Sequence, residues 1–73
     1  MSRVHAELTV VLTDGSSITE YFNQAEMAQF TRSSMLERIA RQQSVTVFDG
    51  DAIEIPAERV ASVTLAIHDL AAV

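Results

Sequence analysis

Apolar and polar side chains alternate along residues 4–12, with the two-residue period of a strand that has one buried face. The face expected to be buried carries Val4, Ala6, Leu8, Val10 and Leu12. An Asp-Gly pair follows at 14–15 and precedes a second strand-like segment at 18–22, a combination typical of a β-hairpin. Gly15 suits the turn because glycine adopts positive φ without steric cost.

Two registers are compatible with this hairpin. A two-residue loop would pair Val10 with Thr19, and a three-residue loop ending at Gly15 would pair Val10 with Ile18. We prefer the second register because it sets apolar side chains opposite each other on one face.

Residues 23–43 predict the helix of the chain, because they are rich in Ala, Glu, Gln, Met, Leu and Arg. Asn23 and Glu26 have the three-residue spacing of a reciprocal helix cap. At about 100° per residue, one face of this helix gathers five apolar side chains. These are Ala25, Ala28, Met35, Leu36 and Ile39. Met27 and Phe30 lie outside this face, each about 180° from one of its members.

Arg32 falls in the middle of the apolar face, within the part of the segment that has the weakest helix propensity. A break there would give two short helices, at about residues 24–31 and 35–42. The broken helix would turn Met27 and Phe30 into the core, whereas a continuous helix would leave both in solvent. The sequence leaves both alternatives open.

A second Asp-Gly pair at 49–50 lies between the strand-like segments 44–48 and 52–55, and predicts a second hairpin. Pro56 ends this hairpin because proline has no N–H to give to a strand ladder, and it begins a single helical turn. Residues 60–67 alternate again and predict the last strand.

The order strand, strand, helix, strand, strand, strand predicts a single α+β domain over residues 1–73. We expect two layers, an antiparallel sheet of about four or five strands with the helical segment on one face. A small closed β-barrel with an inserted helix is the alternative. The predicted core consists of Leu8, Val10, Ile18, Leu36, Ile39, Val47, Ile53, Val63 and Leu65.

Composition narrows the possible partners. The net charge is −5, from ten acidic and five basic residues, which argues against nucleic-acid binding. No apolar run approaches the roughly 20 residues of a membrane span, and no apolar stretch typical of a signal peptide is present, so we expect a cytoplasmic protein. A cysteine-free chain of 73 residues has no disulfide to stabilise it, which favours association with another chain.

Chemistry for catalysis or metal binding is sparse. His5 and His68 would meet if the first and last strands were neighbours, and with an acid such as Asp69 they would form a zinc-ligand set. We take them as surface histidines, because nothing nearby suggests the second shell that holds metal ligands in place. A small metal- or ligand-binding domain or minor enzyme that uses these histidines and nearby acids is the alternative function.

Asp49, Asp51 and Glu54 lie close enough in sequence to bind a hard cation, but they lack the spacing of a calcium loop. Their turn and its solvated edge explain them better. Ser16 and Ser17 follow a glycine without the pattern of a nucleophile elbow, and no glycine-rich phosphate loop is present. We therefore expect no enzyme activity, no metal and no cofactor.

The arginines Arg32, Arg38 and Arg41 are the basic cluster of the chain. Reading nucleic acid would require more bases and stacking aromatic side chains, so we interpret the cluster as a solvated helix face. Glu37 and Arg41 are spaced as an i,i+4 ion pair on it.

These observations predict a non-enzymatic protein–protein interaction module: a small acidic adaptor, inhibitor or assembly subunit, of the kind that phages and mobile elements encode. On a continuous helix, Met27 and Phe30 would form an adaptable apolar anchor for a partner. Glu26 and Glu37 flank the pair, and Arg38 and Arg41 form a rim nearby.

The partner can also be a second copy. A sheet covered by one helix has a second face and two edges to protect. Val11 and Ala66 on that face, with Leu70 and Val73 in the tail, predict a homodimer formed through the sheet or the tail.

Overall fold

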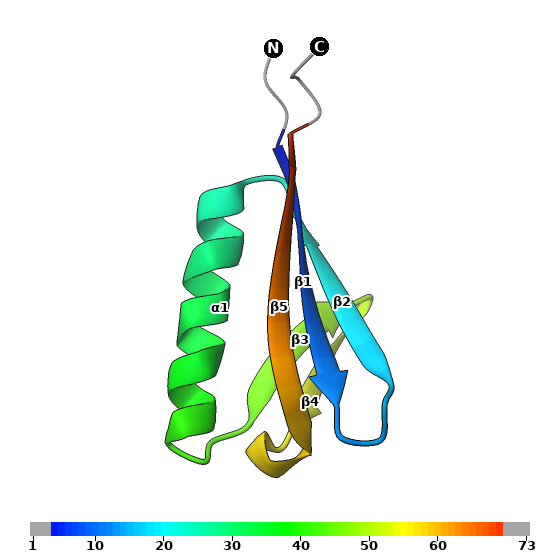
Figure 1. Cartoon of the computed structure of the whole chain (residues 1–73), viewed down its shortest axis with the longest axis vertical. Coiled ribbons are helices and arrows are strands. Elements are labelled where there is room, and N and C mark those ends of the chain that lie inside the picture. The colour runs from blue at the N-terminus through cyan, green and yellow to red at the C-terminus, as the bar shows by residue number, and fades with distance from the viewer. Residues whose placement is uncertain (1–3, 70–73) are drawn as a thin grey trace.

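The computed structural model describes residues 4–69. It contains five strands, one α-helix and a single 3₁₀ turn in the predicted order, so the α+β fold is confirmed (Figure 1). The elements are β1 (Val4–Leu12), β2 (Ser17–Phe22), α1 (Ala25–Ala40), β3 (Val45–Asp49), β4 (Asp51–Ile55), η1 (Ala57–Arg59) and β5 (Val60–Asp69).

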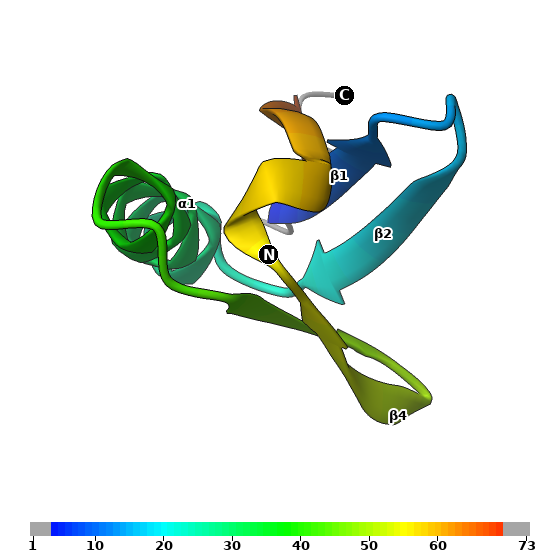
Figure 2. The ribbon, with the colours of Figure 1, turned by 90° about the horizontal axis from the view of Figure 1, so that it is seen from below.

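The strands divide between two antiparallel sheets instead of joining in one. β1 is the centre of a three-stranded sheet with the order β2-β1-β5, and β3 pairs only with β4. Figure 2 shows the β3–β4 hairpin set apart from the larger sheet and at an angle to it. The sheets do not close, so the barrel alternative is wrong. Where β3 passes β2, the Phe48 N–H donates to a Glu20 carboxylate oxygen (3.1 Å) and not to a strand backbone.

The first hairpin has the preferred register. Val10 pairs with Ile18, and the Gly15 N–H donates to the Leu12 carbonyl (3.0 Å) across a three-residue loop. The Asp14 carboxylate accepts hydrogen bonds from the Ser16 hydroxyl (2.6 Å) and the Ser16 N–H (2.9 Å). These hydrogen bonds lower the pKa of Asp14 below its ordinary value, and the nearby Arg59 guanidinium contributes in the same direction.

The second hairpin uses its Asp-Gly pair differently. Asp49 pairs with Asp51, so that Gly50 alone bridges the two strands, with φ of +79°. Gly15 instead takes the last position of its loop, with φ of +92°. The same dipeptide thus serves two turns, because in both a residue with positive φ is required.

Helix α1 is continuous from Ala25 to Ala40, so the two-helix alternative is wrong. Arg32 does not break the helix, because its Nε–H donates to the Val63 carbonyl (3.2 Å) at the outer edge of β5. The predicted cap at Asn23 is also wrong: the helix begins after Gln24, whose side chain makes no capping hydrogen bond.

The carboxyl end of α1 is closed by backbone hydrogen bonds. Gln43 N–H donates to the Arg38 carbonyl (2.8 Å) and Gln42 N–H to the Ile39 carbonyl (2.9 Å), which is the Schellman arrangement. Gln42 has φ of +60°, a left-handed conformation that usually falls to glycine at this position. This end of the helix therefore carries backbone strain.

The core lies between the inner face of the three-stranded sheet, α1 and the β3–β4 hairpin. Its buried apolar residues are Ala6, Leu8, Val10, Ala28, Met35, Val45, Val47, Ile55 and Val63. Of the predicted core, four residues are buried there, and Ile18, Ile39, Ile53 and Leu65 pack against it half-buried.

Leu36 is the exception to the predicted core, since 40 % of its surface is exposed. The neighbouring Met35 is buried in its place, with 3 % exposed. The two side chains point about 100° apart on the helix, and α1 buries a narrower face than the five predicted positions cover.

Valine in place of Gly15 or Gly50 should lower the free energy of unfolding by about 1 kcal/mol or more, because a β-branched residue resists positive φ. A Cβ at either position would meet no atom within 4 Å, so the loss would come from the backbone alone. Urea denaturation measures it, with Ala52→Val on exposed β4 as a control. Unchanged stability in both glycine variants would contradict this account of the turns.

Glycine in place of Gln42 should raise the free energy of unfolding by about 0.5–1 kcal/mol, because it relieves the left-handed strain at the end of α1. The control is Gln43→Gly, one residue further along, where no positive φ is relieved and no gain is expected. Thermal and urea unfolding of the two variants make the comparison, and equal effects would refute the assignment of strain to Gln42.

Candidate functional site

The outer face of α1 carries an exposed apolar pair. Met27 is 58 % and Phe30 is 76 % exposed, whereas Ala28 and Met35 are buried on the face that meets the sheet. The helix is continuous between them, so neither exposed side chain can turn inward without breaking backbone hydrogen bonds. The structure therefore leaves both in solvent, as the continuous-helix alternative predicted.

The charged residues predicted around this pair have different roles. Glu26 is exposed in the first turn of α1. Arg41 forms an exposed ion pair with Glu37 (Nη2 to Oε1, 2.8 Å), as their spacing predicted. The Arg38 Nε–H donates to the Ser44 carbonyl (2.8 Å) and so ties the end of α1 to the start of β3.

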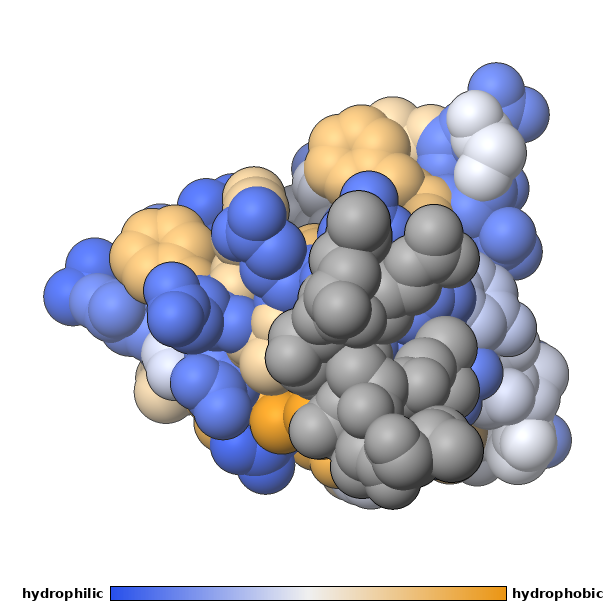
Figure 3. All heavy atoms as spheres, turned by 90° about the horizontal axis from the view of Figure 1, so that it is seen from above, coloured by the Kyte–Doolittle hydropathy of each residue, from blue (hydrophilic) through white to orange (hydrophobic). Residues whose placement is uncertain are grey.

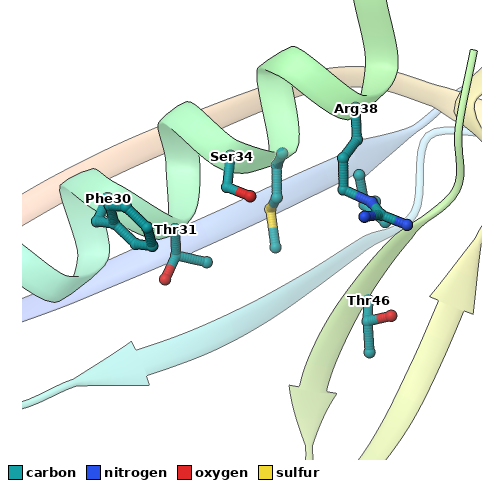
Figure 4. Close-up of a pocket in the computed structure, with 7 residues that line it drawn as sticks. Phe30, Thr31, Ser34, Arg38 and Thr46 are labelled. Carbon is teal, nitrogen blue, oxygen red and sulfur yellow. The ribbon is translucent and has the colours of Figure 1, made fainter. Parts of the chain in front are cut away.

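Beside this face, a groove of about 310 Å³ runs between α1 and β3. It is lined by Phe30, Thr31, Ser34, Met35, Arg38, Val45 and Thr46. Figure 4 shows the helix side chains along one side of the groove, with Thr46 on the strand opposite. The groove thus brings Phe30 and Arg38 to one site, and Met27 does not line it.

The sequence does not predict this groove, because the groove depends on how far the β3–β4 hairpin stands from the helix. Phe48, which is exposed on β3, was also not among the predicted site residues. Alternation along the strand indicates that Phe48 is exposed, since Val45 and Val47 point inward and Phe48 must then point outward.

In Figure 3, hydrophobic side chains form separate patches within a largely hydrophilic surface.

The two histidines are neighbours, as expected if the first and last strands pair. His5 lies opposite His68, and His68 Nε2 lies 3.1 Å from a Glu7 carboxylate oxygen. Among residues 5–68, whose side chains the structure describes, no three potential metal-ligating side chains come together. The Asp69 side chain lies outside the described residues.

The acidic residues of the second hairpin lie beside its turn or contact the loop before β3. Asp49 and Asp51 flank Gly50, and a Glu54 carboxylate oxygen accepts a hydrogen bond from the Ser44 hydroxyl (3.0 Å). These acids therefore border the turn and the loop that precedes β3.

The uncovered face of the three-stranded sheet is mostly polar. A hydrogen bond joins the Thr9 and Thr19 hydroxyls (3.0 Å) across β1 and β2. Val11 is half-buried and Ala66 is exposed on this face, and the other residues of the predicted dimer surface, Leu70 and Val73, lie outside the described residues. Tyr21, which is 70 % exposed, lies on the same face and is its large exposed aromatic side chain among the described residues.

Comparison with models of known protein families, with curated proteins and with solved structures finds no match. Among the described residues, the helix is too short and too polar to cross a bilayer.

Serine in place of both Met27 and Phe30 should change the free energy of unfolding by less than about 1 kcal/mol, because both side chains already lie in solvent. The matched variant Met35→Ala, on the buried side of the same helix, should cost about 2–5 kcal/mol. Thermal and urea unfolding of the two variants test the assignment. Unfolding of the double variant would place the pair in the core instead.

Proposed function

We propose that this protein is a non-enzymatic interaction module that binds a protein partner through the outer face of α1. The observation that supports it is the exposure of Met27 and Phe30 on a helix whose other face is fixed in the core. Burying a Met or Phe side chain against a partner contributes about 1.5–3 kcal/mol each. The pair is preorganised, since the partner need not order the backbone that carries it.

The surroundings of the pair resemble the rim of an interface. Glu26 and the Glu37–Arg41 ion pair are exposed on the same helix. Exposed charges of this kind contribute little affinity but select partners and orient them. With a net charge of −5, the chain would favour a partner with a basic surface. An adaptor, inhibitor or assembly subunit acting in the cytoplasm fits this description.

Self-association belongs to the same proposal. A domain of 73 residues buries a small core, and a homodimer would add to it. We take the helix face as the contact between copies, because Met27 and Phe30 lie one turn apart on it, whereas the uncovered sheet face carries Tyr21 among mostly polar side chains. Sedimentation at micromolar concentration measures this directly, and an 8.0 kDa monomer would remove the homodimer from the proposal.

Capture experiments test the function. The tagged protein, the Met27→Ser/Phe30→Ser variant and a Tyr21→Ser control are each incubated with an extract of the cells that produce the protein. Tyr21 is an exposed aromatic residue on the uncovered sheet face, away from α1. We expect specific partners, or self-association, to be lost with the double variant and kept with the control.

The stability measurement described above ensures that any loss reflects the surface and not unfolding. Equal capture and equal self-association by all three proteins would refute the proposed role of the helix face.

A further inference from the structure

The outer edge of β3 is closed at both ends by side chains. At one end the Ser44 carbonyl accepts the Arg38 Nε–H (2.8 Å), and at the other the Phe48 N–H donates to Glu20 (3.1 Å). Both backbone groups point away from β4. Because every second residue of an antiparallel strand presents its N–H and C=O to the same edge, Thr46, midway between them, does so too. Within residues 4–69, no turn, loop or side chain bonds to the Thr46 backbone.

This open position lies at the groove between α1 and β3. The floor of the groove is apolar, formed by the buried Met35 and Val45, and Phe30 stands beside it. Figure 4 shows Thr46 across the groove from the helix side chains. A chain lying here would find an apolar pocket and a backbone edge at the same place.

Arg38 supplies a positive charge to the same groove. Its Nε–H donates to the Ser44 carbonyl. Among the described residues, no carboxylate forms an ion pair with its guanidinium. The terminal nitrogens of an arginine bind carboxylates through charge-assisted hydrogen bonds. The groove is therefore complementary to a negatively charged group next to an apolar one.

We propose that the groove binds an extended peptide segment of another protein, one with an apolar side chain and a carboxylate two residues apart. The peptide backbone would pair with Thr46, as in recognition by strand addition. Residues two apart on an extended chain share a face, so the apolar side chain would reach Met35 and Val45 while the carboxylate meets Arg38. This inference rests on the part of the proposed function that says a protein partner is bound. The carboxylate is a local match to Arg38, whereas the net charge of −5 acts on the surface of the partner as a whole.

Two observations favour a peptide over other occupants. A volume of about 310 Å³ is at the lower end for small-molecule sites, and this groove is open along a strand edge. A second copy would have to insert one of its own elements into this groove, so the two copies would contribute different surfaces to the contact. Such a contact is heterologous, so it would extend into filaments unless it closed into a ring.

The test uses a fluorescent peptide, acetyl-GSLTESG-amide, and its reversed order GSETLSG, titrated into the full chain and followed by anisotropy. We expect saturable binding of one order. Replacing the peptide's Glu by Gln or its Leu by Ser should weaken that binding, and Arg38→Gln in the protein should weaken it by about tenfold or more. The control is Arg41→Gln, a neighbouring arginine outside the groove, which should leave binding unchanged.

A second measurement needs no variant. Amide hydrogen exchange of the wild-type protein should slow at Thr46 when the peptide is present. The inference would be overturned if neither peptide binds saturably. It would also be overturned if a peptide binds but Arg38→Gln does not weaken the binding and amide exchange at Thr46 does not slow. Peptide-independent self-association that Arg38→Gln abolishes would also overturn it, since the occupant would then be a second copy.

Met27→Ser separates this inference from the proposed function, because Met27 lies outside the groove. A captured partner that is lost with Met27→Ser but kept with Arg38→Gln would support the helix face and refute the groove. A partner lost with Arg38→Gln and kept with Met27→Ser would support the groove and refute the helix face.

Discussion

Burial of the inner face of β1 is the interaction on which the rest of the structure depends. β1 is the strand with a neighbour on both sides, and Ala6, Leu8 and Val10 have almost no exposed surface. Within residues 4–69, one helix and one further hairpin are available to cover that face. Each must therefore contribute a narrow buried side, and each leaves its other side in solvent.

The strand edges that result are managed by long charged side chains. Arg32 bonds to the Val63 carbonyl on β5, Arg38 to the Ser44 carbonyl before β3, and Glu20 to the Phe48 N–H on β3. Unpaired edges invite pairing with other chains, and charged side chains close them. At Phe48, where β3 passes β2, the Glu20 side chain accepts the N–H that a backbone carbonyl would accept in a continuous sheet.

The part of the fold that the sequence predicted is the part set by local chemistry. Alternation defined β1, the two Asp-Gly pairs defined the turns, and pairing of apolar residues selected the register of Val10 with Ile18. The choice of Met35 over Leu36 could not be predicted in this way, since it depends on the angle at which α1 meets the sheet. The Asn23 cap failed for a related reason: a spacing permits a capping hydrogen bond but does not place the chain to make it.

For the candidate site, the sequence reached the pair Met27 and Phe30 but not the groove beside it. Their position on the helix follows from the period of the helix alone, once the helix is continuous. Arg32 is compatible with a continuous helix because its Nε–H donates to the Val63 carbonyl, 31 positions away, and the sequence does not predict that contact. The groove exists because α1 and β3 stand apart, and no local sequence pattern predicts the distance between these two elements.

The distribution of side-chain size supports a role for this exposed surface. The largest fully buried side chains are Leu8, Val10, Val45 and Val47, all aliphatic. Phe30 and Phe48, which are larger, lie mostly in solvent. Since a small domain gains stability mainly from the apolar surface that it buries, stability alone would favour the opposite arrangement. Phe22 does pack against the core, half-buried. The exposure of Phe30 and Phe48 is better explained if these two side chains, like the aromatics enriched at interfaces, are buried by a partner.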